Sequence, residues 1–430
     1  MKNKLQFTSI AVAALMLICL TPVSSALAEP NPYYIGVSQA FSRDSNLFRS
    51  PDNQPATSDV YSTTGLLGGI NQPFGRQRFY VDANVKRNIY QDITQLNNTG
   101  YGLAVGLDWE TIERLSGTLS YSENRTLARY GADDGPQITK RNLEKNRELL
   151  ARARLGLVST FALEGSLTHR QLDYSAAEFA FQEFEQNAGS LGLLYRPSGL
   201  LTLGAALRYT KGKYPFAVQA NPGVLQRDDF DRKDLDLTSV WVPTGLSTVS
   251  ARLSFTRETH EALASRDLSG ATGALTWDYK PTGKLAFTTA LIRDTGAESS
   301  FNRFGGAAAA NTGGNANANA NANAIGNNSR LSSALQLRVL YEATAKIKLE
   351  SNARYARRKL VNTFALTTGG SSTDAGSDRT AELSIGARYE PTRVWLLGCD
   401  LARQQRSSSS SVSYPYSVNQ ASCSAQLKLQ

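Results

Sequence analysis

Histidine and cysteine, the side chains that most often act as catalytic bases, nucleophiles or metal ligands, are scarce in this sequence of 430 residues. The two histidines are His169, on the apolar side of an alternating segment with Leu167, and His260, in an expected loop with Glu258 and Glu261. Neither belongs to a recognisable nucleophile arrangement, and the sequence has no glycine-rich phosphate-binding loop. We therefore expect no enzymatic activity, no metal site and no cofactor.

Cys399 and Cys423 are the cysteines that follow the N-terminal apolar segment, which itself contains Cys19. If the segments around them pair as an antiparallel hairpin with its tip near Ser411, the two thiols lie directly opposite each other. The same register creates one apolar face from Trp395, Leu397, Leu401, Ala421, Ala425 and Leu427. We predict a disulfide between the two cysteines, and two small buried thiols are the alternative.

The N-terminus has the features of a secretory signal. Lys2 and Lys4 precede an apolar run from Ile10 to Leu20, and Ala26-Leu27-Ala28 matches a cleavage site. The run is too short for a membrane anchor, which needs about 20 residues to cross the bilayer. We expect a signal peptide at residues 1–28 and a mature chain at residues 29–430, without a transmembrane helix.

The basic residues outnumber the acidic ones and are scattered along the chain. The formal net charge is +9, and no run of Lys and Arg resembles a nucleic-acid-binding arm. We expect no nucleic-acid partner. Anionic lipid or polyanionic solutes are the more plausible partners of an exported basic protein.

Apolar and polar residues alternate along most of the mature chain. Leu203 and Leu207, for example, alternate with Gly204 and Arg208, which is the period of a strand with one apolar and one polar face. The segment near Val60–Asn71 leaves its face undecided, because Leu66 and Leu67 point to opposite sides. Where the faces are clear, we expect Asp to impair assembly at Leu203 or Leu337, and to be tolerated at Gly204 or Gln336.

The connections between these segments alternate strictly in length. Short connections are expected near 72–77, 110–115, 158–161, 196–199, 242–246, 280–283, 342–345 and 390–393. Long ones are expected near 43–59, 91–99, 129–146, 175–183, 214–232, 259–267, 295–330, 360–379 and 405–415. The pattern predicts an all-β fold: a transmembrane antiparallel β-barrel of about 18 strands of about ten residues, with short periplasmic turns and long extracellular loops, in the bacterial outer membrane. A soluble β-sandwich or propeller is the alternative, but its loops follow no two-sided length rule.

An aromatic residue marks the end of many segments beside a short turn, as in YRPSGL, WVPTGL and YKPTGK. Aromatic rings with a polar edge suit the boundary between lipid and water. The predicted periplasmic aromatic girdle consists of Trp109, Tyr195, Trp241, Tyr279, Tyr341, Tyr389 and Trp395.

Charged side chains occupy the polar face, which would line the interior of a barrel. The predicted lumen-lining residues are Lys86, Arg152, Arg154, Arg170, Arg208, Arg252, Arg338, Arg354, Arg388, Asp82, Glu350 and Glu382. They could form a hydrated lining whose guanidinium excess favours anions or sugars. Alternatively, most of them form ion pairs that only stiffen the wall.

The segment 305–328, GGAAAANTGGNANANANANAIGNN, is of low complexity and lies in the longest extracellular loop. Such a composition cannot form a packed core. It is either a solvated insertion or a loop that folds inward and gates.

The two ends of the mature chain resemble a known family. The segment YYIGVSQAFSRDSNLFR at Tyr33–Arg49, and the pair LLGCDLARQ and SCSAQLKLQ near the end, are similar to the EpsL-type outer-membrane proteins, the β-barrel porins of exopolysaccharide operons. The resemblance implies a passive conduit that exports or helps to assemble an exopolysaccharide or oligosaccharide, together with periplasmic polysaccharide synthesis and export proteins. The alternatives are a general or anion-selective solute porin and a non-conducting scaffold for a synthesis complex.

Overall fold

The computed structural model describes residues 31–112, 114–130, 138–156, 160–221, 224–262, 266–295, 329–365, 371–408 and 413–430. The expected signal peptide at 1–28 and the low-complexity segment at 305–328 lie outside the described residues. The described part forms eighteen β-strands and two short 3-10 helices. The strands are β1 (Tyr33–Asp44), β2 (Asp59–Phe74), β3 (Gln77–Tyr90), β4 (Asn98–Glu110), β5 (Leu115–Leu127), β6 (Leu143–Leu155), β7 (Phe161–Tyr174), β8 (Phe184–Ser198), β9 (Leu201–Asn221), β10 (Val224–Thr244), β11 (Ser247–His260), β12 (Leu268–Thr282), β13 (Leu285–Asp294), β14 (Ser329–Glu342), β15 (Ile347–Ala365), β16 (Ser371–Tyr389), β17 (Trp395–Ser408) and β18 (Tyr416–Leu429), and the helices are η1 (Thr94–Leu96) and η2 (Ala177–Gln182).

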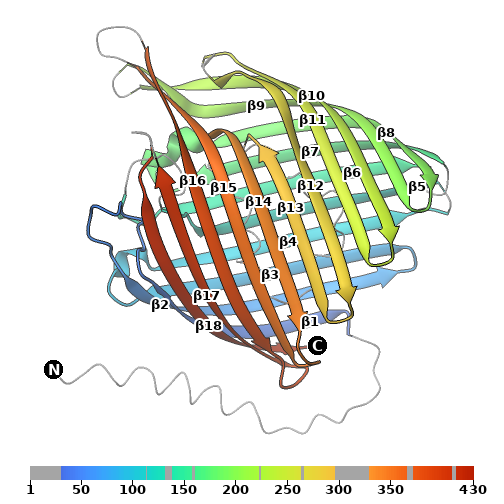
Figure 1. The fold of residues 1–430 in the computed structure, drawn as a ribbon, viewed down its shortest axis with the longest axis horizontal. Coiled ribbons are helices and arrows are strands. Elements are labelled where there is room, and N and C mark those ends of the chain that lie inside the picture. The colour runs from blue at the N-terminus through green and yellow to red at the C-terminus, as the bar shows by residue number, and fades with distance from the viewer. Residues whose placement is uncertain are drawn as a thin grey trace.

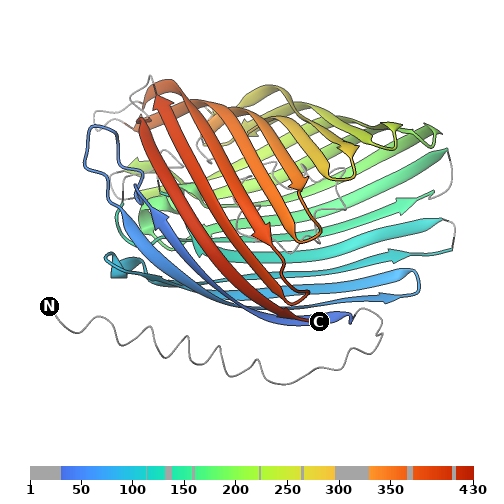
Figure 2. The ribbon, with the colours of Figure 1, turned by 60° about the horizontal axis from the view of Figure 1, so that its bottom comes forward.

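The strands form one closed antiparallel sheet. Each strand pairs with the next along the chain, and β1 also pairs with β18, for example through Ile35 opposite Leu429 and Arg43 opposite Ala421. Figures 1 and 2 show the continuous wall, with the C-terminus beside β1. Closure leaves no edge strand with unpaired backbone groups. The predicted 18-stranded antiparallel barrel is confirmed.

The outer face of the wall is apolar. On β14, Ser333, Leu335 and Leu337 are exposed, whereas Ala334, between Ser333 and Leu335, is buried. A similar alternation occurs along the other strands. A soluble protein would not leave so many exposed leucines in contact with water, but a bilayer solvates them. The protein is therefore a transmembrane β-barrel of the bacterial outer membrane. Within the described part of the chain, no helix has both the length and the apolar character needed to span a bilayer.

The two ends of the barrel differ as the connection lengths predicted. The short connections are 75–76, 111–114, 156–160, 199–200, 245–246, 283–284, 343–346 and 390–394. Most of the connections at the opposite end are longer, such as 45–58 between β1 and β2. By the rule for such barrels, the first end faces the periplasm and the second faces the cell exterior.

Two expected long loops are instead continued by strands. The predicted loop 214–232 is largely replaced by β9, which continues to Asn221, and β10, which begins at Val224. Likewise β15 continues to Ala365 and β16 begins at Ser371, inside the predicted loop 360–379. The strands hold 10 to 21 residues, so the predicted uniform length of about ten was wrong. Beyond the bilayer neither face must be apolar, so backbone pairing can persist after the alternation ends.

Connections at the extracellular end pack against one another. Leu47, Leu96 and Tyr130 come from three different connections and form a buried cluster with Tyr90, the last residue of β3. The Tyr130 hydroxyl donates to the carbonyl oxygen of Lys140 at 2.8 Å, and burial raises the pKa of the Tyr130 phenol above its usual value. This cluster fixes the connections of the first third of the barrel at one end of the interior.

Candidate functional site

The barrel interior holds the polar side chains. All twelve predicted lumen-lining residues lie on the strand face opposite the exposed leucines. Their burial varies: Arg170, Arg208 and Arg252 are buried, whereas Asp82 is exposed. Arg208 and Arg252 join a group on β9–β11, Arg354 lies in a second group on β15–β18, and most of the others pair locally.

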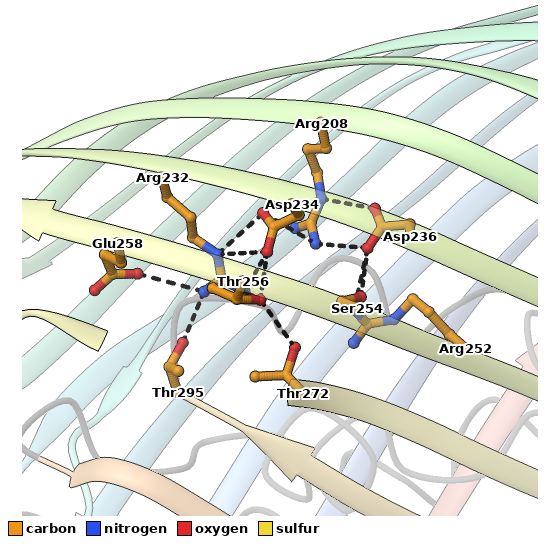
Figure 3. A network of polar contacts seen from close by, with 10 residues as sticks. All are labelled: Arg208, Arg232, Asp234, Asp236, Arg252, Ser254, Thr256, Glu258, Thr272 and Thr295. Carbon is orange, nitrogen blue, oxygen red and sulfur yellow. Dashed lines mark hydrogen bonds and ion pairs between the residues drawn. The ribbon is translucent and has the colours of Figure 1, made fainter. Parts of the chain in front are cut away.

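The first group is a network of ion pairs on β9, β10 and β11 (Figure 3). Arg208 Nε donates to Asp236 Oδ2 at 3.0 Å, and a second Arg208 nitrogen lies 3.3 Å from Asp234 Oδ2. Arg232 donates to the other oxygen of Asp234 at 3.0 Å. Two aspartates two residues apart on β10 therefore hold arginines from β9 and from β10 itself in one row.

Hydroxyl groups from β11 and β12 complete this network. Thr256 Oγ1 donates to Asp234 Oδ1 at 2.5 Å and lies 3.4 Å from Thr272 Oγ1, while Arg252 donates to Ser254 Oγ at 2.5 Å. Arg232 also reaches Glu258 at 3.4 Å (Figure 3). The three arginines and three carboxylates of Figure 3 balance in charge. Such a balanced buried set needs its hydrogen bonds to offset desolvation, and it stiffens the wall.

His260 extends the network toward the extracellular end. The expectation that His260 lies in a loop was wrong, because it is the last residue of β11 and is buried. Its Nδ1 lies 2.8 Å from Asp228 Oδ2, its Nε2 lies 3.1 Å from Glu258 Oε1, and its ring stacks on Phe230. Strand pairing continues past the membrane here, and the imidazole ties β10 to β11.

The second group lies on β15–β18 and is unbalanced. Asp378 receives two hydrogen bonds from Arg358, with Nε at 3.0 Å, and one from Ser413 Oγ at 2.9 Å. Arg406 Nε lies 3.7 Å from the same carboxylate and its guanidinium lies 4.7 Å from the Tyr416 ring centroid. Arg354 lies four residues before Arg358 on the same face of β15 and is partly exposed, and its buried Nε has no hydrogen-bond partner among the described residues.

Most of the other predicted lumen residues pair locally, in the manner of wall-stiffening ion pairs. Arg154 and Arg152 flank Glu164 at 2.5 and 4.0 Å, Arg338 lies 2.8 Å from Glu350, Arg388 lies 2.8 Å from Asp400, and Asp82 accepts from Tyr34 at 2.7 Å. Arg354 lies opposite Glu382 in the strand register. The Arg170 guanidinium lies 5.0 Å from the centroid of the Phe184 ring.

The sequence-based set omitted several members of these groups. Arg232, Arg358, Asp378 and Arg406 share the inward parity of their strands and were not among the predicted residues. Arg358 lies four residues after Arg354, so the same period-two count would have identified it. The contact of Arg406 with Asp378 could not be read in this way, because it depends on which residues of β16 and β17 stand side by side.

The aromatic residues of the predicted girdle lie at the periplasmic ends of their strands. Tyr195, Trp241, Tyr341 and Tyr389 are exposed on the outer face, and Trp109, Tyr279 and Trp395 are half-buried there. Phe161 stacks on Tyr195 and Phe287 on Tyr279, so phenylalanines that the prediction left out contribute to the same band.

The closing hairpin has the predicted register. Cys399 pairs with Cys423, Trp395 with Leu427 and Leu401 with Ala421, and the two sulfurs form a disulfide. Both cysteines are exposed on the outer face, so the disulfide faces lipid rather than the lumen. Among the described residues, no group of three or more His, Cys, Asp or Glu side chains is arranged to hold a metal ion.

Comparisons with solved structures find outer-membrane proteins at low sequence identity. No family model and no curated protein matches the sequence. Similar solved structures include the outer membrane protein OpdK from Pseudomonas aeruginosa, at 12% identity over 92% of this chain and 99% of that chain with a TM-score of 0.46. OccK2 (OpdF) of the same organism has 11% identity, coverages of 92% and 98%, and a TM-score of 0.48. A BenF-like porin from Pseudomonas fluorescens has 12% identity, coverages of 94% and 100%, and a TM-score of 0.46.

Proposed function

We propose that this barrel is an outer-membrane channel for small polar solutes, with a preference for those that carry a carboxylate or another anionic group. The observation that carries the proposal is the group on β15–β18. Arg354, Arg358 and Arg406 gather on the interior wall beside two carboxylates: Asp378, which Arg358 and Arg406 contact, and Glu382, which lies opposite Arg354 in the register. Guanidinium groups bind carboxylates through paired hydrogen bonds, so this wall has capacity for a further anion.

Arg354 is the member of this group best placed to meet a solute. Its side chain is partly exposed, whereas Arg358 and Arg406 are buried against Asp378. A carboxylate that exchanges briefly at Arg354 would bind weakly, which a conducting site requires, because a tightly bound solute cannot leave.

The network on β9–β11 favours a small solute over a polymer. Arg232, Asp234 and Asp228 are almost fully buried, so side chains pack closely over this part of the inner wall. A polysaccharide chain would need a continuous wide path past these side chains. Export or assembly of an exopolysaccharide remains a second candidate, supported by the resemblance of the chain ends to EpsL-type proteins, and a non-conducting scaffold for periplasmic synthesis proteins is a third.

Ion selectivity in planar lipid bilayers tests the channel. In a potassium chloride gradient the reversal potential should indicate preference for chloride, and Arg354→Gln should reduce the chloride-to-potassium permeability ratio by roughly two- to fourfold, the effect of one charge at about 5 Å in water. Arg403→Gln is the matched control, because it removes one positive charge from an exposed position on the outer face and leaves the lumen unchanged. No current, or a cation preference unaffected by Arg354→Gln, would overturn the proposal.

Deletion of the gene distinguishes the solute channel from the polysaccharide conduit and the synthesis scaffold. Normal secretion of polymer would leave the solute channel as the function. Polymer trapped in the periplasm would favour an export conduit, and loss of all polymer would favour a scaffold needed for synthesis. Addition of long glycans to the bilayer experiment gives the matching test in vitro, since a conduit for polymer should be blocked by them and a narrow solute channel should not.

A further inference from the structure

The outward-facing charges at the extracellular end of the wall fall into two sectors. On β5–β9 the basic residues have acidic neighbours on the same outer face. Lys145 lies 2.9 Å from Glu123, Arg147 lies 3.2 Å from Asp173, and Lys213 lies 2.8 Å from Glu185. In this sector the protein neutralises its own cations.

The sector β11–β18 lacks such neighbours. Its outward-facing basic residues are Arg257, Arg293, Arg357, Lys359, Arg379 and Arg403, all exposed. No outward-facing position in the described parts of these eight strands is Asp or Glu, and none of the six basic residues has an ion-pair partner among the described residues. Within the described part of the chain, these cations therefore have no counter-charge on the outer face of these strands.

Three of these arginines form a row across neighbouring strands. Arg293 pairs with Ser333, Ser333 with Arg357, and Arg357 with Arg379. The row crosses β13 to β16, which lie side by side in Figure 1. Arg357 and Arg379 stand directly opposite each other, an arrangement that destabilises a sheet unless an anion lies between the two charges.

An apolar groove lies beneath this row on the outer wall. The next outward row toward the periplasm is Leu275, Leu291, Leu335 and Tyr355. These four side chains line a hollow of about 1070 Å³, and Arg293 and Arg357 line it as well. Gly273 lines the same hollow, and because glycine has no side chain, the hollow is deeper at this position.

The height of the row matches the outer headgroup region. Ten residues separate Ile347, at the periplasmic end of β15, from Arg357. At about 3.3 Å per residue and a tilt of about 40°, this is a rise of roughly 25 Å, the height of the apolar band of an outer-membrane barrel. Tyr389 and Arg379 on β16 have the same separation. The arginines thus stand where the outer leaflet changes from acyl chains to headgroups.

We propose that the β13–β16 face binds a phosphorylated, acylated glycolipid of the outer leaflet, the lipid A part of lipopolysaccharide. Arg293, Arg357 and Arg379 hold a phosphate, which guanidinium groups bind through paired hydrogen bonds. An acyl chain lies in the groove over Leu291, Leu335 and Tyr355. The phosphate offsets the repulsion between the opposed arginines. This surface is independent of the proposed transport function, because it lies on the other side of the wall.

Native mass spectrometry of the full-length protein in detergent, titrated with bisphosphorylated lipid A, tests this site. R357Q/R379Q should weaken binding roughly tenfold or more, as expected for the loss of two charge-assisted contacts to one phosphate. K145Q/K213Q removes two outward-facing cations from the paired sector and should bind lipid A within about twofold of the unmodified protein. The shift of the folded protein on unboiled gels verifies that each variant forms a barrel.

Dephosphorylated lipid A and inorganic phosphate test whether the phosphate and the acyl chains are both recognised. Dephosphorylated lipid A should bind the unmodified protein as weakly as lipid A binds R357Q/R379Q, and inorganic phosphate alone should not compete at equal concentration. R357K/R379K keeps the charge but loses the paired hydrogen bonds, so it should weaken lipid A binding by roughly threefold. It replaces R357Q/R379Q in the test if that variant fails to fold. Equal losses in both glutamine double variants, or equal binding of phosphorylated and dephosphorylated lipid, would overturn the proposal.

Discussion

At the scale of single residues, the side of the wall decides which substitution is tolerated, but the inner side is not uniformly permissive. Leu203 is exposed to lipid, and Gly204 faces inward. A Cβ at Gly204 would overlap Thr238 Oγ1 and would lie 2.8 Å from Leu194 Cδ2. The face alone predicts that Asp is tolerated at Gly204, but the structure predicts a cost, because side chains from two adjacent strands must move to admit it.

Leu337 and Gln336 give the clean test of the two faces. Leu337→Asp places a charge near the middle of the apolar band and should lower the free energy of unfolding by on the order of 2 kcal/mol. Gln336→Asp faces inward, opposite Arg354 in the register, and should change it little. Urea titration of the two variants in phospholipid vesicles measures the difference. Equal losses in both variants would contradict the face assignment.

At the scale of elements, the closing hairpin shows how one register serves two purposes. Pairing of Trp395 with Leu427 and Leu401 with Ala421 keeps one face apolar, and the same register brings Cys399 to Cys423. Because β18 also pairs with β1, the disulfide clamps the hairpin that closes the barrel. The β9–β10 hairpin differs, since its backbone pairing continues beyond the alternation that marks the membrane.

Replacement of both cysteines by alanine should weaken the closing hairpin without removing it. The sequence separation is 24 residues. A cross-link closing a loop of that size stabilises a protein by roughly 3 kcal/mol, mainly through the unfolded chain. We expect C399A/C423A to form a barrel that unfolds at a lower urea concentration. The folded, disulfide-bonded protein in vesicles should also resist a charged phosphine reductant, because both sulfurs face lipid; rapid reduction there would contradict this placement.

At the scale of the whole molecule, the two ends and the two outer sectors have different roles. Tight turns at one end keep neighbouring strands in register, and longer connections at the other pack around Leu47, Leu96 and Tyr130. The balanced interior network on β9–β11 stiffens one part of the wall, and the arginine group on β15–β18 makes another part more positive. Six of the basic residues that contribute to the net charge of +9 face outward on β11–β18, so the net charge of the chain does not measure the charge of the interior.

The orientation of the barrel can be tested by labelling single introduced cysteines in intact cells. Gly245 lies in the turn between β10 and β11 with open space around it, and Gln54 is exposed in the connection between β1 and β2. A membrane-impermeant maleimide should label Gln54→Cys in intact cells, and should label Gly245→Cys only after the outer membrane is permeabilised. The reverse pattern would place the short turns outside the cell.

The sequence by itself determined the barrel, its eighteen strands, the outward and inward faces of most strands and the register of the closing hairpin. These follow from the period of two that lipid imposes on every membrane-crossing segment, and this period is a local property. It could not place Leu66 and Leu67, which are adjacent and equally apolar. The structure exposes Leu66 and turns Leu67 inward, where its Cδ1 lies 3.2 Å from the position a Cβ of Gly36 would take.

Only the tertiary structure decided which charges meet. Inward parity identified Arg354 and Arg208 as interior residues, but the contacts of Arg358 and Arg406 with Asp378 depend on strands whose register is set across the sheet. The same holds for the opposed Arg357 and Arg379 on the outer face. Beyond the membrane the alternation ends, so strand ends and the burial of His260 also required the fold. Local periodicity specifies a side of the wall, and long-range pairing specifies the neighbour.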